Sequence, residues 1–290
     1  MIVVENLSKK FGEVWALRGV TFSVGGGRVA SILGPNGAGK TTLVRILITE
    51  LLPTSGRAYV AGHDVVKEAE KLRRKIAAVP QEGSPIGFLT PREFVYAYLL
   101  LRGYPRREAR QKTERALEEL QLLDVKDREI QTLSGGTKRR VLLAAVLAAD
   151  ADVVFLDEPT TGLDVFSRRV VWNAVASMRR RGITVLLTTH YVEEAQTLSD
   201  YVVIINRGRV VDMGSPEDLV EKVPGKYVVE AYGASDARRP HIAIGDRAIY
   251  FVDDPKEVAD PLVEAGAKVS IRQKSLEDYI LYKVGVISEE

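Results

Sequence analysis

The sequence predicts an α/β fold built around a parallel sheet, followed by a smaller α+β unit. Two patterns predict the sheet: apolar strand-like and helical segments alternate in the second half of the chain, and near its start an apolar strand runs into a glycine-rich loop that opens a helix. A chain of 290 residues is long enough for two domains. Its 46% hydrophobic and 28% charged residues are typical of a packed globular protein.

The N-terminal part is predicted to consist of strands. Residues 2–5, 21–24 and 29–33 are strand-like, and turns such as Gly25-Gly26-Gly27 separate them. The last of these strands runs into the glycine-rich loop, and a helix is expected over residues 41–47. The chain starts on a strand without a basic and then apolar leader, so no secretion signal is expected.

A helical region follows at about residues 84–149. Thr90 can cap a helix, Pro91 suits its first turn, and Glu93 can reach back to the cap. A second helix is expected over about residues 106–123. The basic run Lys138-Arg139-Arg140 is interpreted as a solvated helix face.

Strands and helices then alternate again. We expect a strand over residues 153–156, a helix over about 167–181 and a strand over 183–188. Residues 201–206 and 209–212 flank Arg207-Gly208 as a hairpin, and Ser215 opens a short helix.

A large domain over residues 1–223, with a helical subdomain at about 84–149, is therefore predicted to precede a small α+β domain over 224–290. In the small domain, strands at 227–231, 248–252 and 268–271 surround a helix near 256–265.

Composition excludes several classes of protein. The 41 basic and 39 acidic residues give a net charge of +2, too balanced to indicate a nucleic-acid partner. The absence of cysteine excludes disulfides and thiolate metal sites. The longest apolar run, residues 141–149, is well short of the roughly 18–20 residues that span a bilayer. We therefore expect a soluble protein inside the cell.

The glycine-rich loop fits the phosphate-binding pattern GxxxxGK[ST] and lies between a strand and a helix, as that chemistry requires. Backbone amides of such a loop close around phosphates, and the helix N-terminus faces them. Lys40 would supply charge to the β- and γ-phosphates, and the Thr41 hydroxyl would coordinate Mg²⁺. The predicted ATP-binding residues here are Gly34, Pro35, Asn36, Gly37, Ala38, Gly39, Lys40, Thr41 and Thr42.

Two carboxylates end the apolar strand at 153–156. Acidic groups are expected where a buried parallel strand emerges at its C-terminal edge, the ligand-binding edge of α/β sheets. Asp157 would hold hydrated Mg²⁺, and Glu158 would orient and polarise the attacking water.

The segment Leu133-Ser134-Gly135-Gly136 opens an apolar helix. A serine cap beside two glycines can bind an anion, although the tetrapeptide alone also fits an ordinary N-cap. The carboxylate strand follows about 20 residues later, and this spacing favours the anion-site interpretation.

Taken together, these motifs resemble the ATP-binding cassette family in order and spacing. The loop matches the Walker A motif, Leu133 to Gly136 the signature, and Asp157 with Glu158 the end of Walker B. Gln81 resembles the family's glutamine after a strand, Gly162-Leu163-Asp164 its D-loop and His190 its switch histidine. The resemblance extends from residue 2 to about residue 222.

The resemblance implies roles for individual residues. Phe11 would stack on adenine, where the family usually has tyrosine. Gln81 would sense the γ-phosphate and ligate the metal, and His190 would hydrogen-bond the γ-phosphate. Ser134 and Gly136 of one subunit would close over the γ-phosphate held by Lys40 of the other, and Gly135 and Asp164 are further predicted ATP-binding residues. Thr137 replaces the glutamine that commonly closes the signature, which puts the contact there in question.

The resemblance also implies a fold and an activity: a P-loop NTPase with a parallel-sheet core, an N-terminal antiparallel β subdomain and a helical subdomain. It implies an ATPase using ATP and Mg²⁺ that works as a homo- or heterodimer and powers transport through an integral membrane permease. Such a subunit is expected to be cytoplasmic and peripheral on the inner face of the cell membrane.

The class of transporter is less closely defined. The tail at 275–281 resembles ATPase subunits of multidrug, antibiotic-resistance and sodium exporters, which favours export; import and lipid or polysaccharide traffic stay open. Outside transport, the chain could be a cassette ATPase acting on ribosomes or DNA, or a P-loop kinase. The chain lacks the second cassette or long coiled coils of the former, and the latter would not need the signature, Gln81 and His190 together.

Overall fold

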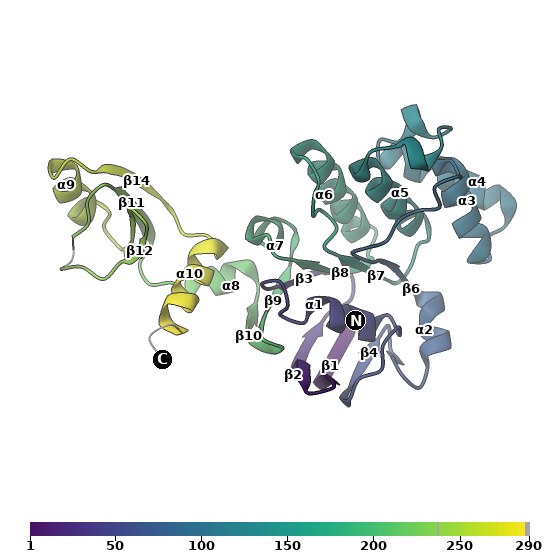
Figure 1. Ribbon diagram of the computed structural model, residues 1–290, viewed down its shortest axis with the longest axis horizontal. Helices are drawn as coiled ribbons and strands as arrows, with labels where there is room; N and C mark the ends of the chain where they lie inside the picture. Colours follow the sequence, from purple (N-terminus) through teal and green to yellow (C-terminus); the bar gives the residue numbers. More distant parts are fainter. Residues whose placement is uncertain (237, 288–290) are drawn as a thin grey trace. The chain divides into compact units, whose positions relative to one another are not determined.

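The chain folds into two compact units, Met1–Met213 and Gly214–Glu290. The computed structural model describes residues 1–236 and 238–287 (Figure 1). The first unit holds two sheets and most of the helices, and the second is a small α+β unit. The predicted fold class is therefore confirmed. The functional boundary between residues 223 and 224 stays a prediction.

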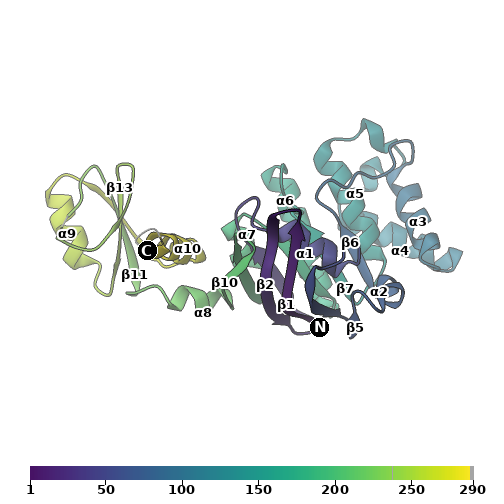
Figure 2. The ribbon, with the colours of Figure 1, turned by 60° about the horizontal axis from the view of Figure 1, so that its bottom comes forward.

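An antiparallel sheet forms the N-terminal part of the first unit. Its strand order is β2-β1-β4-β5, and Figure 2 shows β1 and β2 side by side. The strands are β1 (Ile2–Phe11), β2 (Val14–Val24), β4 (Ser55–Val60) and β5 (His63–Asp64). The first two are longer than predicted because the register shifts between Val4 and Leu7, where Asn6 has a φ of 46°, and this bulge breaks the period-two pattern.

The second sheet of this unit has the order β10-β9-β3-β8-β7-β6, and its pairs β9-β3, β3-β8, β8-β7 and β7-β6 are parallel. The strands are β3 (Val29–Leu33), β6 (Ile76–Val79), β7 (Val153–Asp157), β8 (Thr184–Thr189), β9 (Tyr201–Asn206) and β10 (Arg209–Gly214). The expected hairpin joins β9 to β10 through Arg207 and Gly208, both at positive φ, as a two-residue turn requires.

Apolar cores cover both faces of the parallel sheet, which explains its almost uninterrupted apolar strands. On one face, Ala30, Ile32 and Phe155 pack with the antiparallel sheet and with α1 (Lys40–Leu47). On the other face, Val154 and Leu156 pack with the helical region. Helix α1 thus lies between the two sheets (Figure 1).

The helical region contains α3 (Pro91–Leu101), α4 (Arg106–Glu119), the 3-10 turns η1 (Leu123–Val125) and η2 (Ile130–Thr132), and α5 (Gly135–Ala148). Thr90 and Glu93 form the predicted capping box of α3. The other helices of this unit are α2 (Ala69–Lys75), α6 (Val165–Arg180) and α7 (Val192–Leu198). Within residues 1–236 and 238–287, no helix is both long and apolar enough to span a bilayer.

The second unit is a four-stranded antiparallel sheet with the order β12-β13-β11-β14. Its elements are α8 (Pro216–Glu221), β11 (Tyr227–Tyr232), β12 (Ile242–Ile244), β13 (Arg247–Val252), α9 (Lys256–Glu264), β14 (Lys268–Gln273) and α10 (Leu276–Ile287). Val229, Ala231 and Tyr250 pack against α9 on one face of the sheet.

A network of ionic side chains connects this sheet to the start of α10. Arg272 donates two hydrogen bonds to the fully buried Asp278, at 2.6 and 2.7 Å, and one to Glu230 at 2.7 Å. Arg247 pairs with the same Glu230, and Ser275 donates to Asp278 at the cap of α10. Burial by itself raises the pKa of Asp278, but the hydrogen bonds from Arg272 and Ser275 outweigh it and hold the pKa below its ordinary value.

We predict that Asp278→Ala destabilises the second unit by about 2–4 kcal/mol, because it leaves Arg272 without its bidentate partner. Hydrogen exchange at β11, β13 and β14 should accelerate while exchange at β3 and β8 stays unchanged. Glu264→Ala, at an exposed position of α9, is the matched control. In the wild type, the protection of these amides relative to their intrinsic exchange rate should also fall as the pH falls through the lowered pKa of Asp278, since protonation removes the ionic contact. Equal exchange rates in Asp278→Ala and Glu264→Ala would contradict the stabilising role of Asp278.

Candidate active site

The phosphate-binding loop runs from the end of β3 to the start of α1, and two of its glycines are required by close contacts. A Cβ on Gly34 would lie 2.2 Å from the Ile205 carbonyl oxygen. Gly39 has a φ of 105°, and a Cβ there would lie 2.4 Å from the Ala16 carbonyl oxygen. Neighbouring strands therefore fix the path of the loop, and only glycine fits at these two positions.

Lys40 is the first residue of α1 and is almost completely buried. Its ammonium donates to the carbonyl oxygens of Gly34 at 2.8 Å and Pro35 at 3.1 Å. It also lies 3.3 Å from a carboxylate oxygen of Glu158, which is equally buried. The loop thus curls around the lysine charge, which faces the carboxylate at the end of β7.

The two predicted carboxylates lie at the C-terminal end of β7, as expected. Asp157 is its last residue and accepts a hydrogen bond from the Thr188 hydroxyl of β8. Glu158 has a φ of 47°, a left-handed conformation that costs a non-glycine residue about 1–3 kcal/mol. Its backbone N–H donates to the same Thr188 hydroxyl at 2.9 Å. Strand β8 therefore helps to hold Glu158 in a strained backbone conformation.

The Glu158 side chain is kept ionised. Burial raises its pKa, but a hydrogen bond from the Thr161 hydroxyl and the nearby Lys40 ammonium outweigh burial and hold the pKa below its ordinary value. The His190 ring lies 3.4 Å from the same carboxylate, although its Nδ1 atom makes no hydrogen bond to any residue that the structure describes. An ionised carboxylate that faces the phosphate loop can accept a proton from a water molecule.

Three oxygen atoms converge beside the loop. The Thr41 hydroxyl lies 3.4 Å from both an Asp157 carboxylate oxygen and the Gln81 amide oxygen. Hydroxyl, carboxylate and amide oxygens are the hard donors that Mg²⁺ prefers, with water and phosphate completing its octahedron. No cluster of three or more His, Cys, Asp or Glu side chains suited to a metal occurs among the described residues. The set therefore fits a magnesium ion held jointly with a phosphate.

These residues border two adjoining hollows. One, of about 320 Å³, is lined by residues of the phosphate loop together with Ala16, Gln81 and Glu158. The other, of about 340 Å³, is lined by Thr41, Gln81 and Asp157 among others. Gln81 follows β6 and Asp157 ends β7. These two strands are parallel neighbours, so their C-terminal ends, and with them Gln81 and Asp157, lie at the same edge of the sheet.

The remaining predicted residues lie elsewhere. Phe11 ends β1 and is half-exposed, with the Lys9 ammonium 5.0 Å from its ring centre. Ser134 caps α5 by accepting from the Thr137 backbone N–H, and Asp164 caps α6 in the same way through Ser167. None of Phe11, Ser134, Gly135, Gly136 or Asp164 lines either hollow. One chain therefore brings the loop and the carboxylates together but leaves the signature apart from them.

Arg139 of α5 belongs to the site although its sequence context indicated only a solvated helix face. One guanidinium nitrogen donates to the carbonyl oxygens of Pro80 at 2.6 Å and Gln81 at 3.2 Å, and another to those of Asp157 at 2.6 Å and Glu158 at 3.2 Å. Burial lowers the pKa of Arg139, and the charges of Asp157 and Glu158 oppose that effect. Arg139 thus links two backbone segments, one around Gln81 and one around Glu158. The only sequence signal was its place five residues after Ser134.

Comparison with known sequences gives close relatives. The family model described as "ABC transporter" matches residues 17–161. The daunorubicin resistance ATP-binding protein of Streptomyces coeruleorubidus is 37% identical over 98% of this chain and 96% of its own length. The Nod factor export ATP-binding protein I of Burkholderia lata is 34% identical over 97% of this chain and 95% of its own length.

Solved structures of ATP-binding cassettes match about three quarters of the chain. A dimeric ATP-binding cassette in a post-hydrolysis state, bound to ADP and Pi, has a TM-score of 0.68 at 28% identity and covers 74% of this chain and 98% of its own. The ATP-binding subunit of an ABC transporter has a TM-score of 0.70 at 26% identity and covers 77% of this chain and 92% of its own.

We predict that Arg139→Met lowers kcat for ATP hydrolysis by roughly 10- to 100-fold with little change in KM, because Glu158 is misplaced while Lys40 and the loop are intact. Arg139→Lys, which keeps the charge but loses the planar fork, should recover part of kcat. Arg115→Met, on the exposed side of α4, is the matched control. Steady-state kinetics decide the outcome: a rise in KM at unchanged kcat would contradict this role.

Proposed function

Because the chain belongs to the ABC transporter family, we propose that it is the ATP-hydrolysing subunit that powers export through a separate membrane-spanning partner. The contact between Lys40 and Glu158 at the mouth of the phosphate loop supports the hydrolytic part most directly. The relatives that match nearly the whole chain are named for drug resistance and for Nod factor export, which supports the transport part.

Triphosphate binding follows from the loop geometry. Backbone N–H groups of the loop and of the first turn of α1 surround the β-phosphate, and Lys40 turns from Glu158 toward the phosphate oxygens. This exchange leaves the buried Glu158 carboxylate with Thr161 and His190 as its neighbours. ATP binding therefore frees the catalytic carboxylate at the place where the γ-phosphate arrives.

Hydrolysis requires a water molecule in line with the γ-phosphate. Glu158 accepts the proton of that water, Gln81 orients the water through its amide, and His190 donates to the γ-phosphate. Thr41, Asp157 and Gln81 would hold Mg²⁺, which neutralises charge on the β- and γ-phosphates. The products are ADP and inorganic phosphate.

A second copy of the fold completes the site. Ser134, Gly135 and Gly136 open α5 away from the phosphate loop of their own chain, where they can meet the γ-phosphate held by another chain. A head-to-tail dimer then contains two shared sites, and ATP binds the closed dimer better than the open one. Hydrolysis removes that preference, and the opening of the dimer works on the membrane partner. We place the dimer at the inner face of the cell membrane, because ATP is a cytoplasmic substrate.

We predict that Glu158→Gln lowers kcat by at least about 100-fold, because the amide keeps the shape of the side chain but accepts no proton. ATP binding should persist, and ATP should shift the protein toward dimers in light scattering. Glu119→Gln, at an exposed site on α4, should hydrolyse ATP as the wild type does. An unchanged rate in Glu158→Gln would refute the assignment of Glu158 as the base.

A second prediction tests the shared site. Lys40→Ala and Ser134→Arg should each be inactive alone, because each damages both sites of a homodimer. Mixed dimers carry both changes in one site and none in the other, so ATPase activity should reappear on mixing. The activity should peak at equal proportions of the two variants. Mixtures that stay inactive at every ratio would exclude the head-to-tail arrangement.

A further inference from the structure

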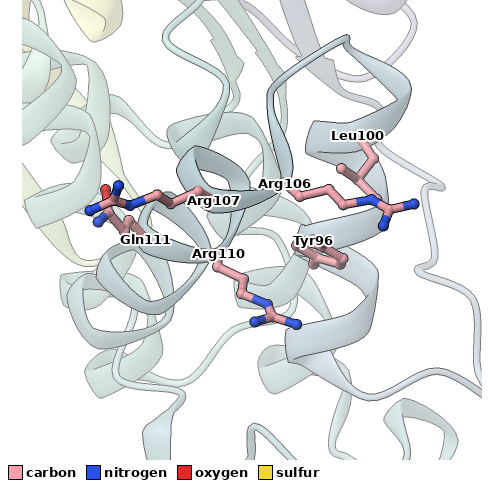
Figure 3. A pocket seen from close by; sticks show the side chains of 6 residues that line it. All are labelled: Tyr96, Leu100, Arg106, Arg107, Arg110 and Gln111. Carbon is pink, nitrogen blue, oxygen red and sulfur yellow. The ribbon is translucent and has the colours of Figure 1, made fainter.

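A basic and apolar surface lies on the helical region, away from the ATP site. We call it the α3–α4 surface and define it by Tyr96, Leu100, Leu101, Arg106, Arg107 and Arg110. All but Leu101 line one hollow of about 580 Å³, together with Gln111. Figure 3 shows Arg106 and Arg110 extending from α4 toward α3, which carries Tyr96 and Leu100.

The three arginines of this surface carry uncompensated charge. Residues 102–112 contain five basic side chains and one acidic one. Arg102 donates to backbone carbonyls, and Lys112 pairs with Glu108 and Asp150. Among the described residues, Arg106, Arg107 and Arg110 form no ion pair or hydrogen bond.

This arrangement destabilises α4 locally. Arg106 and Arg107 stand in its first turn, where the helix dipole favours negative charge. Arg106 and Arg110 are four residues apart on the same face, a spacing at which like charges repel. Figure 3 shows Arg106 and Arg110 on the side of α4 that faces α3, whereas Arg107 extends the other way, beside Gln111. An anion between Arg106 and Arg110 would relieve their repulsion, and a surface with several anionic groups would also neutralise Arg107. Guanidinium binds phosphate in a planar, bidentate geometry.

Exposed apolar side chains border the charge. Leu101, the last residue of α3, is 89% exposed, and Leu100 is 36% exposed. Tyr96 adds a ring with an apolar body and a polar tip, a combination that favours the membrane–water interface. A free phosphate or an acidic peptide would neutralise the arginines but leave Leu101 in water. An anionic bilayer accommodates both the arginines and the leucine, since the basic side chains bind its phosphates and the leucine enters its apolar layer.

We propose that the α3–α4 surface binds the anionic phospholipid headgroups of a membrane leaflet, with Leu101 inserted below them. The proposal depends on the proposed function only in bringing the chain to a membrane. Binding to lipid and hydrolysis of ATP are separate measurements, so one can fail while the other stands.

Cosedimentation of the full chain with vesicles tests the proposal. Binding to vesicles that contain phosphatidylglycerol should exceed binding to pure phosphatidylcholine and weaken as salt rises. The triple variant Arg106→Gln, Arg107→Gln, Arg110→Gln should lower the partition coefficient by roughly 100-fold, because each basic group near such a surface contributes roughly 5-fold and the three factors multiply. The matched control changes three exposed arginines that are far apart in the sequence and have no partner among the described residues: Arg115→Gln, Arg180→Gln and Arg209→Gln.

A second variant separates a lipid surface from the other anions. Leu101→Gln should weaken vesicle binding by about 10-fold with no change in the basic groups. All variants should hydrolyse ATP in solution at the wild-type rate. Equal loss in the two triple variants would mean that only net charge matters and would overturn the proposal. Inorganic phosphate that displaces the protein at millimolar concentration, or a membrane partner that binds through Arg106 to Arg110 without lipid, would also overturn it.

Discussion

The contact between Lys40 and Glu158 is the interaction on which the site depends. The two residues follow β3 and β7, which are not neighbours: β8 lies between them in the sheet. Their side chains meet because all three strands are parallel and end at one edge, and because Thr188 of β8 holds both Asp157 and the backbone of Glu158. Glu158, at a left-handed φ of 47°, reaches the lysine with its carboxylate at 3.3 Å. The order of strands therefore determines the chemistry as much as the motifs do.

The C-terminal unit illustrates how one motif can have two explanations. Ser275 and Asp278 resemble the tail of exporter subunits, and they also form an ordinary helix cap. In the structure, Asp278 both caps α10 and pairs with Arg272, which in turn holds Glu230. The internal electrostatics of this unit thus require an acidic residue at position 278. The support for export therefore comes from the relatives that match nearly the whole chain. The tail motif adds little to it, because the packing of this unit already explains these residues.

Local patterns allowed much of the site to be predicted, and contacts across the fold explain what was missed. The phosphate loop and the carboxylate pair were predictable because glycine, lysine and acidic residues carry their chemistry at short, fixed spacing. Arg139 was not predictable, since a basic run on a helix is typical of a solvated face. The three residues of that run point in different directions: Lys138 donates to Gln131, Arg139 to the catalytic loops, and Arg140 to Leu120 and Gln121. The full length of β1 was missed because the bulge near Asn6 interrupts its alternation.

Helix α5 connects the two halves of the proposed dimer mechanism. Its N-terminus carries Ser134, which is expected to act on ATP of the second chain, and its second turn carries Arg139, which holds the backbone of Gln81 and Glu158 in its own chain. Its apolar residues, such as Val141 and Leu143, pack into the core of the helical region. A helix packed in this way moves as a rigid element, so a shift at Ser134 also shifts Arg139. In the proposed dimer, contact of Ser134 with the nucleotide of one site would therefore be transmitted to the Glu158 carboxylate of the other site, and we expect hydrolysis at the two sites to be interdependent.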